Sequence, residues 1–162
     1  MAMDVFLKLS NDVKGESKIS GHEDEIDVLA WSWGMSQSGS MHVGGGGGSG
    51  KVAVQDVSIT KYVDKASSII LKKCCNGTHF DEAVLTIRKA GGDAPVEYYK
   101  LTMKKVIISS ISTGGSGGED QLTENITMNF ANFASSYTPQ QDDGSADAAI
   151  DAGWDIEANV EM

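Results

Sequence analysis

Two glycine-rich tracts constrain this chain most, because each interrupts a residue pattern typical of β-strands. They span residues 44–50 and 113–118, and each leads into a segment that alternates apolar and polar residues. Glycine costs a helix about 1 kcal/mol relative to alanine and tolerates positive φ. We therefore predict that both tracts are loops or turns between strands.

The first tract also comes close to a phosphate-binding loop. Residues 45–51 match G-x-x-x-x-G-K, but Val52 stands where the metal-binding hydroxyl should be. Such a loop must open a helix whose N-terminal amides face the phosphates. Residues 52–60 are instead rich in β-branched side chains. We interpret the tract as a flexible strand connector and expect no nucleotide binding.

Length and charge limit the classes of protein. With 162 residues, the chain is expected to form a single domain, residues 1–162, that buries about 70% of its unfolded surface. Acidic residues outnumber Lys and Arg by 23 to 13, the net charge is −10, and Arg88 is the only arginine. This balance disfavours a nucleic-acid partner, and a single arginine side chain is too few for bidentate recognition of several phosphates.

The two cysteines, Cys74 and Cys75, are adjacent in the sequence. Their Cα atoms lie about 3.8 Å apart, below the usual disulfide range of about 4.4–6.8 Å. We predict two free thiols packed as small buried hydrophobic groups, with no metal and no cofactor, which suits a reducing cytosol.

The first residues show no targeting signal. Residues 1–9 lack a basic region followed by a long apolar stretch and a small-residue cleavage site, so we expect no signal peptide. No segment approaches the ~20 apolar residues of a membrane span.

Alternation of apolar and polar residues predicts a mainly β protein. It is clearest over 150–161, and it recurs from Leu122, with Glu124 as its one exception. Shorter strands are expected at 5–9, 26–33, 52–63, 84–89, 96–103 and 106–111, with hairpin tips at 91–93 and 114–118. Repeated strands separated by turns favour an antiparallel β-barrel or a β-sandwich.

One short helix is predicted beside this barrel. Asp64 can cap the run 65–75, where Ile70 and Cys74 repeat at four-residue spacing, as do Leu71 and Cys75, and Asn76–Gly77 ends it. We expect the apolar stripe of the helix to lie against the barrel.

Candidate catalytic residues do not form a recognisable set. His22, His42 and His79 are far apart, so we interpret them as surface or turn residues, and no G-x-S-x-G motif is present. Residues 143–151 place oxygen side chains at alternate positions, but Ala148 and Trp154 stand where a calcium loop needs glycine and glutamate. A solvated acidic loop is the favoured interpretation. A small acidic β-barrel enzyme or metal-binding protein with a site near residues 142–151 is the alternative.

The segment 25–34 carries two tryptophans around a serine. In a regular strand Trp31 and Trp33 point to one side as core or interface anchors, and Ser32 points to the other.

The chain resembles a known family along almost its whole length, in chain order. The matching residues are 15–17, His22, 25–34, 61–62, 64–65, 112–120, 129–130, 137–140 and 153–156. They look like the haemolysin-coregulated protein (Hcp) family, the tube subunits of bacterial type VI secretion.

The resemblance implies a structural protein and no enzyme. It implies an antiparallel β-barrel of two sheets with one short flanking helix, assembled as a hexameric ring. It also implies that rings stack into a tube inside a contractile sheath, capped by a VgrG spike. The tube would be assembled in the bacterial cytoplasm, then secreted without a cleavable signal peptide, and its lumen can carry small effectors. Ser32 matches the family's lumen-facing serine.

The first glycine tract is expected to act between subunits or rings. Six of the twelve residues from 40 to 51 are glycine. The segment therefore has few side chains that could pack together and fix its conformation, and we expect a neighbouring molecule to supply those contacts. We expect Gly44, Gly45, Gly46, Gly47 and Gly48 to make these contacts.

Overall fold

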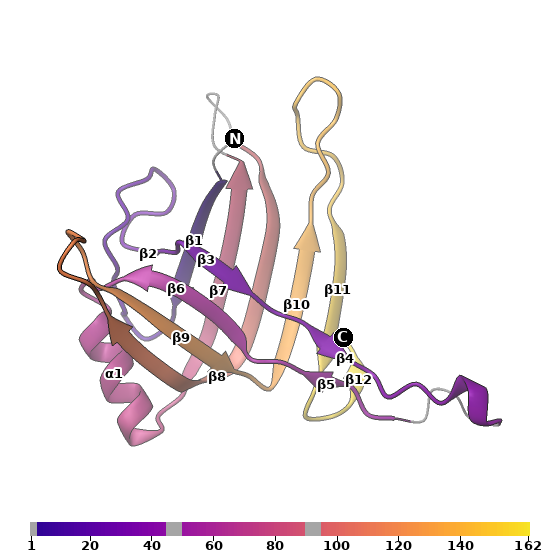
Figure 1. Ribbon diagram of the computed structural model, residues 1–162. Helices are drawn as coiled ribbons and strands as arrows, with labels where there is room; N and C mark the ends of the chain where they lie inside the picture. The colour runs from indigo at the N-terminus through magenta and orange to yellow at the C-terminus, as the bar shows by residue number, and fades with distance from the viewer. Residues whose placement is uncertain (1–2, 45–49, 90–94) are drawn as a thin grey trace.

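The computed structural model describes residues 3–44, 50–89 and 95–162, which form a mainly β protein with one α-helix (Figure 1). The elements in chain order are β1 (Met3–Leu9), β2 (Ile26–Asp27), β3 (Ala30–Ser32), β4 (Met35–Ser36), the 3₁₀ helix η1 (Met41–Val43), β5 (Ala53–Val54), β6 (Val57–Tyr62), α1 (Ser67–Asn76), β7 (Phe80–Lys89), β8 (Glu97–Gly114), β9 (Thr123–Asn129), β10 (Asn132–Tyr137), β11 (Ile150–Asp155) and β12 (Val160–Glu161).

Two antiparallel sheets share the long strand β8. The first follows the order β12-β11-β10-β8-β7-β1-β2, and the second follows β3-β6-β9-β8. In Figure 1 the strands of the second sheet cross those of the first, and α1 lies at one end. The pair β4 and β5 forms a separate ribbon. The predicted two-sheet antiparallel barrel with one flanking helix is confirmed.

Strand β8 passes from one sheet to the other around Lys105. It pairs with β10 up to Lys104, with β7 up to Val106 and with β9 from Ile107 onward. At this change of partners, Lys105 has φ 53°, a left-handed conformation that non-glycine residues adopt at some cost. We predicted two strands here, ending at 103 and starting at 106. The chain instead continues as one strand bent at Lys105.

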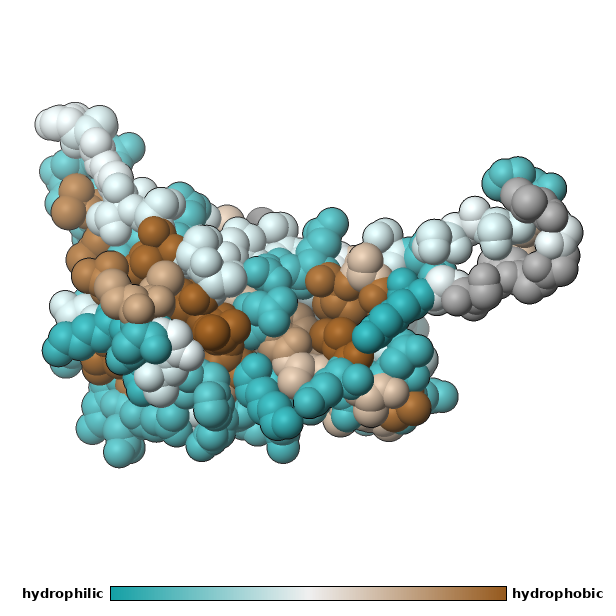
Figure 2. Space-filling model, turned by 90° about the horizontal axis from the view of Figure 1, so that it is seen from below, coloured by the Kyte–Doolittle hydropathy of each residue, from teal (hydrophilic) through white to brown (hydrophobic). Residues whose placement is uncertain are grey.

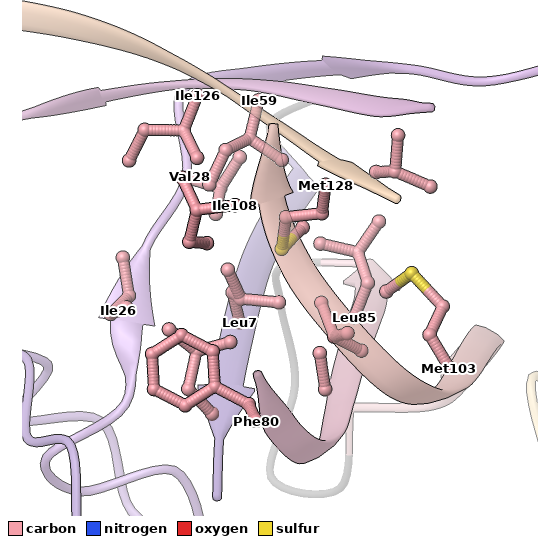
Figure 3. Close-up of a cluster of buried hydrophobic side chains, with 14 of the residues drawn as sticks. Leu7, Ile26, Val28, Ile59, Phe80, Leu85, Met103, Ile108, Ile126 and Met128 are labelled. Atoms are coloured by element: carbon pink, nitrogen blue, oxygen red, sulfur yellow. The ribbon is translucent and has the colours of Figure 1, made fainter. Parts of the chain in front are cut away.

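The core fills the space between the two sheets. Leu7, Leu85 and Met103 from the first sheet face Ile59, Ile126 and Met128 from the second (Figure 3). All six are almost completely buried. The alternation from Leu122 onward therefore predicted the apolar face of β9 correctly, since Ile126 and Met128 are buried.

Three predicted strands are broken where the chain changes partners. The segment 52–63 splits into β5, which pairs with β4, and β6, which pairs with β3 and β9. The segment 26–33 splits into β2, which pairs with β1, and β3, which pairs with β6. The segment 150–161 splits at a turn into β11 and β12. Its expected apolar face is only partly buried, because Trp154 and Ile156 pack on the core whereas Ile150 and Val160 are more than half exposed. Strand β10 was not predicted.

Helix α1 begins two residues later than predicted. Asp64 caps the preceding turn, where its Oδ1 accepts the Ala66 amide at 2.9 Å. Gly77, at φ 69°, ends the helix by donating to the Lys73 carbonyl, as expected. The buried stripe is Ala66, Ile70 and part of Cys74. The prediction of two buried cysteines is wrong for Cys75, which is exposed, because its side chain lies on the solvent side of the helix.

A buried lysine joins α1 to the second sheet and explains the exceptional Glu124. Lys61 is 0% and Glu124 2% exposed, and they are opposite each other on β6 and β9. The Lys61 ammonium donates to Glu124 Oε2 at 2.5 Å and Asp64 Oδ1 at 2.9 Å. Ser67, the first residue of α1, donates to the same Glu124 oxygen at 2.7 Å.

Replacing Lys61 with methionine should destabilise the fold severely. The Lys61→Met variant leaves the carboxylates of Glu124 and Asp64 without their cation, and removing one partner of a buried pair costs about 3–5 kcal/mol. Urea unfolding of the monomer measures this loss. Adding Glu124→Gln to Lys61→Met should recover part of it, and an unchanged midpoint for Lys61→Met alone would contradict the assigned role.

Asp27 should make the folded protein less stable as the pH rises. Partial burial, then the nearby Asp64, Asp4 and Glu16, raise the pKa of Asp27. A raised folded-state pKa gives stability that is present below the unfolded value of about 3.9 and is lost as pH rises through the folded value. Asp27→Asn should therefore raise the melting temperature at pH 7 and leave it unchanged at pH 3. Calorimetry at both pH values tests this, and equal shifts at both would contradict it.

Candidate functional site

The outer face of the second sheet is covered by hydroxyl and amide side chains. Cross-strand register places Ser32, Ser58, Thr127 and Ser110 in one row over β3, β6, β9 and β8. The next row contains Ala30, Thr60, Asn125 and Ser112. We call these two rows the hydroxyl face. None of the eight residues carries a charge or a large apolar group.

Many of these polar groups bond to one another. Thr60 Oγ1 donates to Asn125 Oδ1 at 2.7 Å, and the hydroxyls of Ser110 and Thr127 lie 2.6 Å apart. At the end of the rows, Asp56 accepts hydrogen bonds from Ser109 and Asn129. Part of the hydrogen-bonding capacity of the face is therefore used within the face itself.

The opposite side of β3 anchors the strand to the core. Trp31 packs inward and stacks on Tyr99 of β8, with ring centroids 5.7 Å apart. Trp33 follows on the same side and meets Phe133 edge-on at 4.8 Å. Partial burial raises the pKa of Tyr99 above its usual value. Ser32 is exposed on the other side, so the strand has the two-sided arrangement that its sequence predicted.

An apolar groove of about 580 Å³ lies beside these tryptophans, between the β4–β5 ribbon and strands β10 and β11. We call it the tryptophan groove. Its walls include Trp33, Met35, Val52, Phe133, Ala152 and Trp154. Within the described residues, the buried indole N–H groups of Trp33 and Trp154 have no hydrogen-bond acceptor. A buried donor left unpaired costs about 1–3 kcal/mol. Neither the groove nor these orphan donors were predicted from the sequence.

His22 makes the turn hydrogen bond that was one of its two expected roles, but its side chain is buried and does not lie on the surface. The side chain is 8% exposed and stacks on Phe6 with ring centroids 4.4 Å apart. Its Nδ1 lies 2.9 Å from Glu25 and its Nε2 2.6 Å from Glu97. The segment between β1 and β2 is thereby pinned over the outer side of β1. Glu97 is 75 residues from His22 in sequence, so no local pattern could reveal the contact.

The remaining candidates stay apart from one another. His42 and His79 are exposed. The acidic loop 138–149 is held by local turns, in which bonds from Ser145 lower the pKa of Asp143. No group of three His, Cys, Asp or Glu side chains in the described residues could hold a metal ion. In the described part of the chain, no helix has the length and apolar content needed to cross a membrane.

The first glycine tract lies largely outside the described residues. Gly44 follows η1 with φ 73°, in the left-handed region that favours glycine. The predicted contact residues Gly45 to Gly48 lie outside the described ranges, as does the hairpin tip expected at 91–93. After the tract come the strands β5 and β6, where a phosphate-binding loop would need a helix.

Solved structures with this architecture define a class of secretion-system proteins. One described as a type six secretion system protein is 29% identical, with a TM-score of 0.92, over 99% of this chain and 100% of that one. Hcp1 from Salmonella typhimurium is 32% identical, with a TM-score of 0.80, over all of both chains.

The sequence comparisons identify the family within that class. Residues 6–137 match the family described as "Type VI secretion system effector, Hcp". Protein hcp1 of Pseudomonas aeruginosa is 59% identical over 162 residues, which is 99% of each chain. The chain belongs to the Hcp family of type VI secretion, as its sequence motifs predicted. Family membership also places it among structural secretion proteins and not among enzymes.

The two sides of β3 should respond differently to substitution. Trp31→Ala should lower the free energy of unfolding by about 2 kcal/mol, less than the ~3–5 kcal/mol of a fully buried aromatic ring, because Trp31 is partly exposed. Ser32→Gln should change it by less than about 0.5 kcal/mol. Chemical denaturation measures both, and a larger loss for Ser32→Gln would show that the strand faces the other way.

Proposed function

We propose that this chain is the subunit of a secreted tube. Copies form a hexameric ring, rings stack within a contractile sheath below a VgrG-type spike, and the hydroxyl face lines the lumen. The observation that carries this proposal is the hydroxyl face itself, on a chain whose family is Hcp.

The chemistry of the hydroxyl face suits a passage for folded cargo. A strongly charged wall would bind oppositely charged proteins, and an apolar wall would bind exposed hydrophobic patches. The two rows of the hydroxyl face carry neither charge nor a large apolar side chain. Hydrogen bonds within the face, such as that from Thr60 to Asn125, already use part of its hydrogen-bonding capacity. Small effectors can therefore be held weakly and released.

The edges of the molecule support assembly with other copies. Strand β3, at the edge of the second sheet, has three residues, and β12, at the edge of the first, has two. Ile150 and Val160 are 65% and 51% exposed beside that second edge. Sheet edges and exposed apolar side chains are stable when another chain covers them, and a heterologous contact between identical chains closes into a ring. We propose Gly44 to Gly48 as part of such contacts.

Assembly should be visible in solution. Light scattering on a size-exclusion column should give a ring mass at micromolar concentration. Six chains of −10 carry about −60, so stacking of rings should weaken at low salt, where the repulsion is least screened. A monodisperse monomer at that concentration would contradict the proposed tube.

Cargo binding should depend on the hydroxyl face and not on the outer helix. Ser32→Gln should leave rings intact and lower the recovery of a co-expressed effector, because a larger group changes the inner wall. Ser68→Gln is the matched control, since Ser68 is exposed on α1. Equal loss of cargo in both variants, or loss in neither, would contradict the position of the lumen.

A further inference from the structure

The buried imidazole of His22 has a carboxylate at each of its two nitrogens. Nδ1 lies 2.9 Å from Oε2 of Glu25, three residues along the chain, and Nε2 lies 2.6 Å from Oε1 of Glu97, the first residue of β8. The ring stacks almost parallel on Phe6 of β1, which is 1% exposed. We call His22, Glu25 and Glu97 the histidine clamp.

The two contacts of the clamp require a charged ring. An ionised carboxylate only accepts hydrogen bonds, whereas neutral imidazole has one donor nitrogen and one acceptor nitrogen. A neutral His22 can therefore donate to Glu25 or to Glu97, and its lone pair then faces the other carboxylate. Only the imidazolium, with a proton on both nitrogens, makes both hydrogen bonds. Histidine is also the side chain that ordinarily changes charge between pH 5 and 8.

His22 is the main source of positive charge at the clamp carboxylates. In the part of the chain that the structure describes, no other cation lies within 4 Å of Glu25, and Glu97 has only the half-exposed Lys100, 3.7 Å away. A third carboxylate, Glu23, lies beside them. Its own backbone amide and that of Gly21, and then the charge of His22, lower the pKa of Glu23. Loss of the ring's charge would therefore leave mutually repelling carboxylates at this position.

The charges on the Phe6 side of the ring are already paired. Arg88 of β7 lies over the Phe6 ring, 5.4 Å from Cζ to the ring centroid, and its Nε donates to Asp4 of β1 at 3.3 Å. Neither Arg88 nor Asp4 forms an ion pair with the clamp in the described residues. The state of the clamp is therefore decided by His22 and the carboxylates that face it.

The clamp holds a folded-back segment against the first sheet. Between β1 and β2, the amides of Gly15 and Ser17 donate to the carbonyls of Asp24 and Glu25 at 2.7 and 3.0 Å, and the Asp24 amide donates back to Ser17 at 2.9 Å. These bonds join residues 15–17 to 24–25. The contact between His22 and Glu97 joins the same segment to β8, 75 residues away in sequence.

We propose that the histidine clamp is a pH-sensitive switch, which holds residues 15–25 over Phe6 while His22 is charged and releases them when the ring loses a proton. Its contribution to stability is present in full below about pH 6.5, where histidine in an unfolded chain ordinarily gives up its proton, and is lost as the pH rises. The switch lies within one chain, so it is independent of the proposed ring.

Amide hydrogen exchange measures the release directly. The molecule already exposes separate apolar patches, brown in Figure 2, so a dye that binds apolar surface would not isolate Phe6. Protection factors correct for the intrinsic effect of pH on exchange. Those of the Gly15, Ser17 and Asp24 amides should be at least about tenfold lower at pH 8 than at pH 5.5, because a hydrogen bond to a charged group stabilises by that factor or more.

Two substitutions separate the charge of the clamp from its shape. A glutamine amide both donates and accepts, so Glu97→Gln can bond to either form of His22, and its protection factors should change less than about twofold between the two pH values. His22→Asn should give low protection at both. Glu119→Gln, which neutralises an exposed carboxylate elsewhere, is the matched control and should behave like the wild type. Circular dichroism should show all three variants folded.

Nitrogen NMR of the imidazole ring links the release to its proton. In the wild type, both nitrogens of His22 should be protonated at pH 5.5, and protection should fall with the same midpoint as the loss of the second proton. Equal protection at both pH values in the wild type would overturn the proposal. So would a tenfold fall that persists in Glu97→Gln, or a His22 ring with one bare nitrogen at pH 5.5.

Discussion

The buried Lys61 ammonium is the interaction on which the arrangement of the second sheet depends. It joins β6 to β9 through Glu124 and joins both to the start of α1 through Asp64 and Ser67. Three elements are thus fixed by one charged group that solvent cannot reach. A buried cation tolerates few other geometries, since each displaced carboxylate would be left unpaired. Because this network holds β6 and β9 in one register, it also fixes which residues are neighbours in the hydroxyl face on the other side of these strands.

The two faces of the second sheet have different roles. Toward the core, Trp31, Ile59 and Ile126 supply burial and hold the strands against the first sheet. Outward, Ser32, Ser58 and Thr127 supply a neutral polar surface. Because side chains alternate strictly along a strand, a substitution on one face can leave the other nearly unchanged. The chemistry of the outward face can therefore change without loss of the fold.

The sequence allowed prediction of what depends on local periodicity. The burial of alternate residues in β9, the glycine that ends α1, and the opposite directions of Trp31 and Ser32 all follow from neighbours along the chain. Contacts between distant residues could not be predicted that way. Glu124 interrupts its apolar pattern, and its reason is a lysine on another strand. His22 meets Glu97 across the first sheet. The division of 26–33 into β2 and β3 depends on which strand offers an edge, and the groove exists only once β4, β5, β10 and β11 are assembled.

The bend at Lys105 has a mechanical consequence. One continuous strand contributes to both sheets, and Lys105, in a left-handed conformation, lies where the strand passes from one sheet to the other. In the proposed ring, the second sheet at the lumen would therefore be joined to the first sheet by a continuous strand, and not by a flexible loop. In the tube that we propose, this continuous strand would resist a change in the diameter of the lumen when the sheath contracts. An external force would then move the whole tube along its axis and would not narrow its lumen.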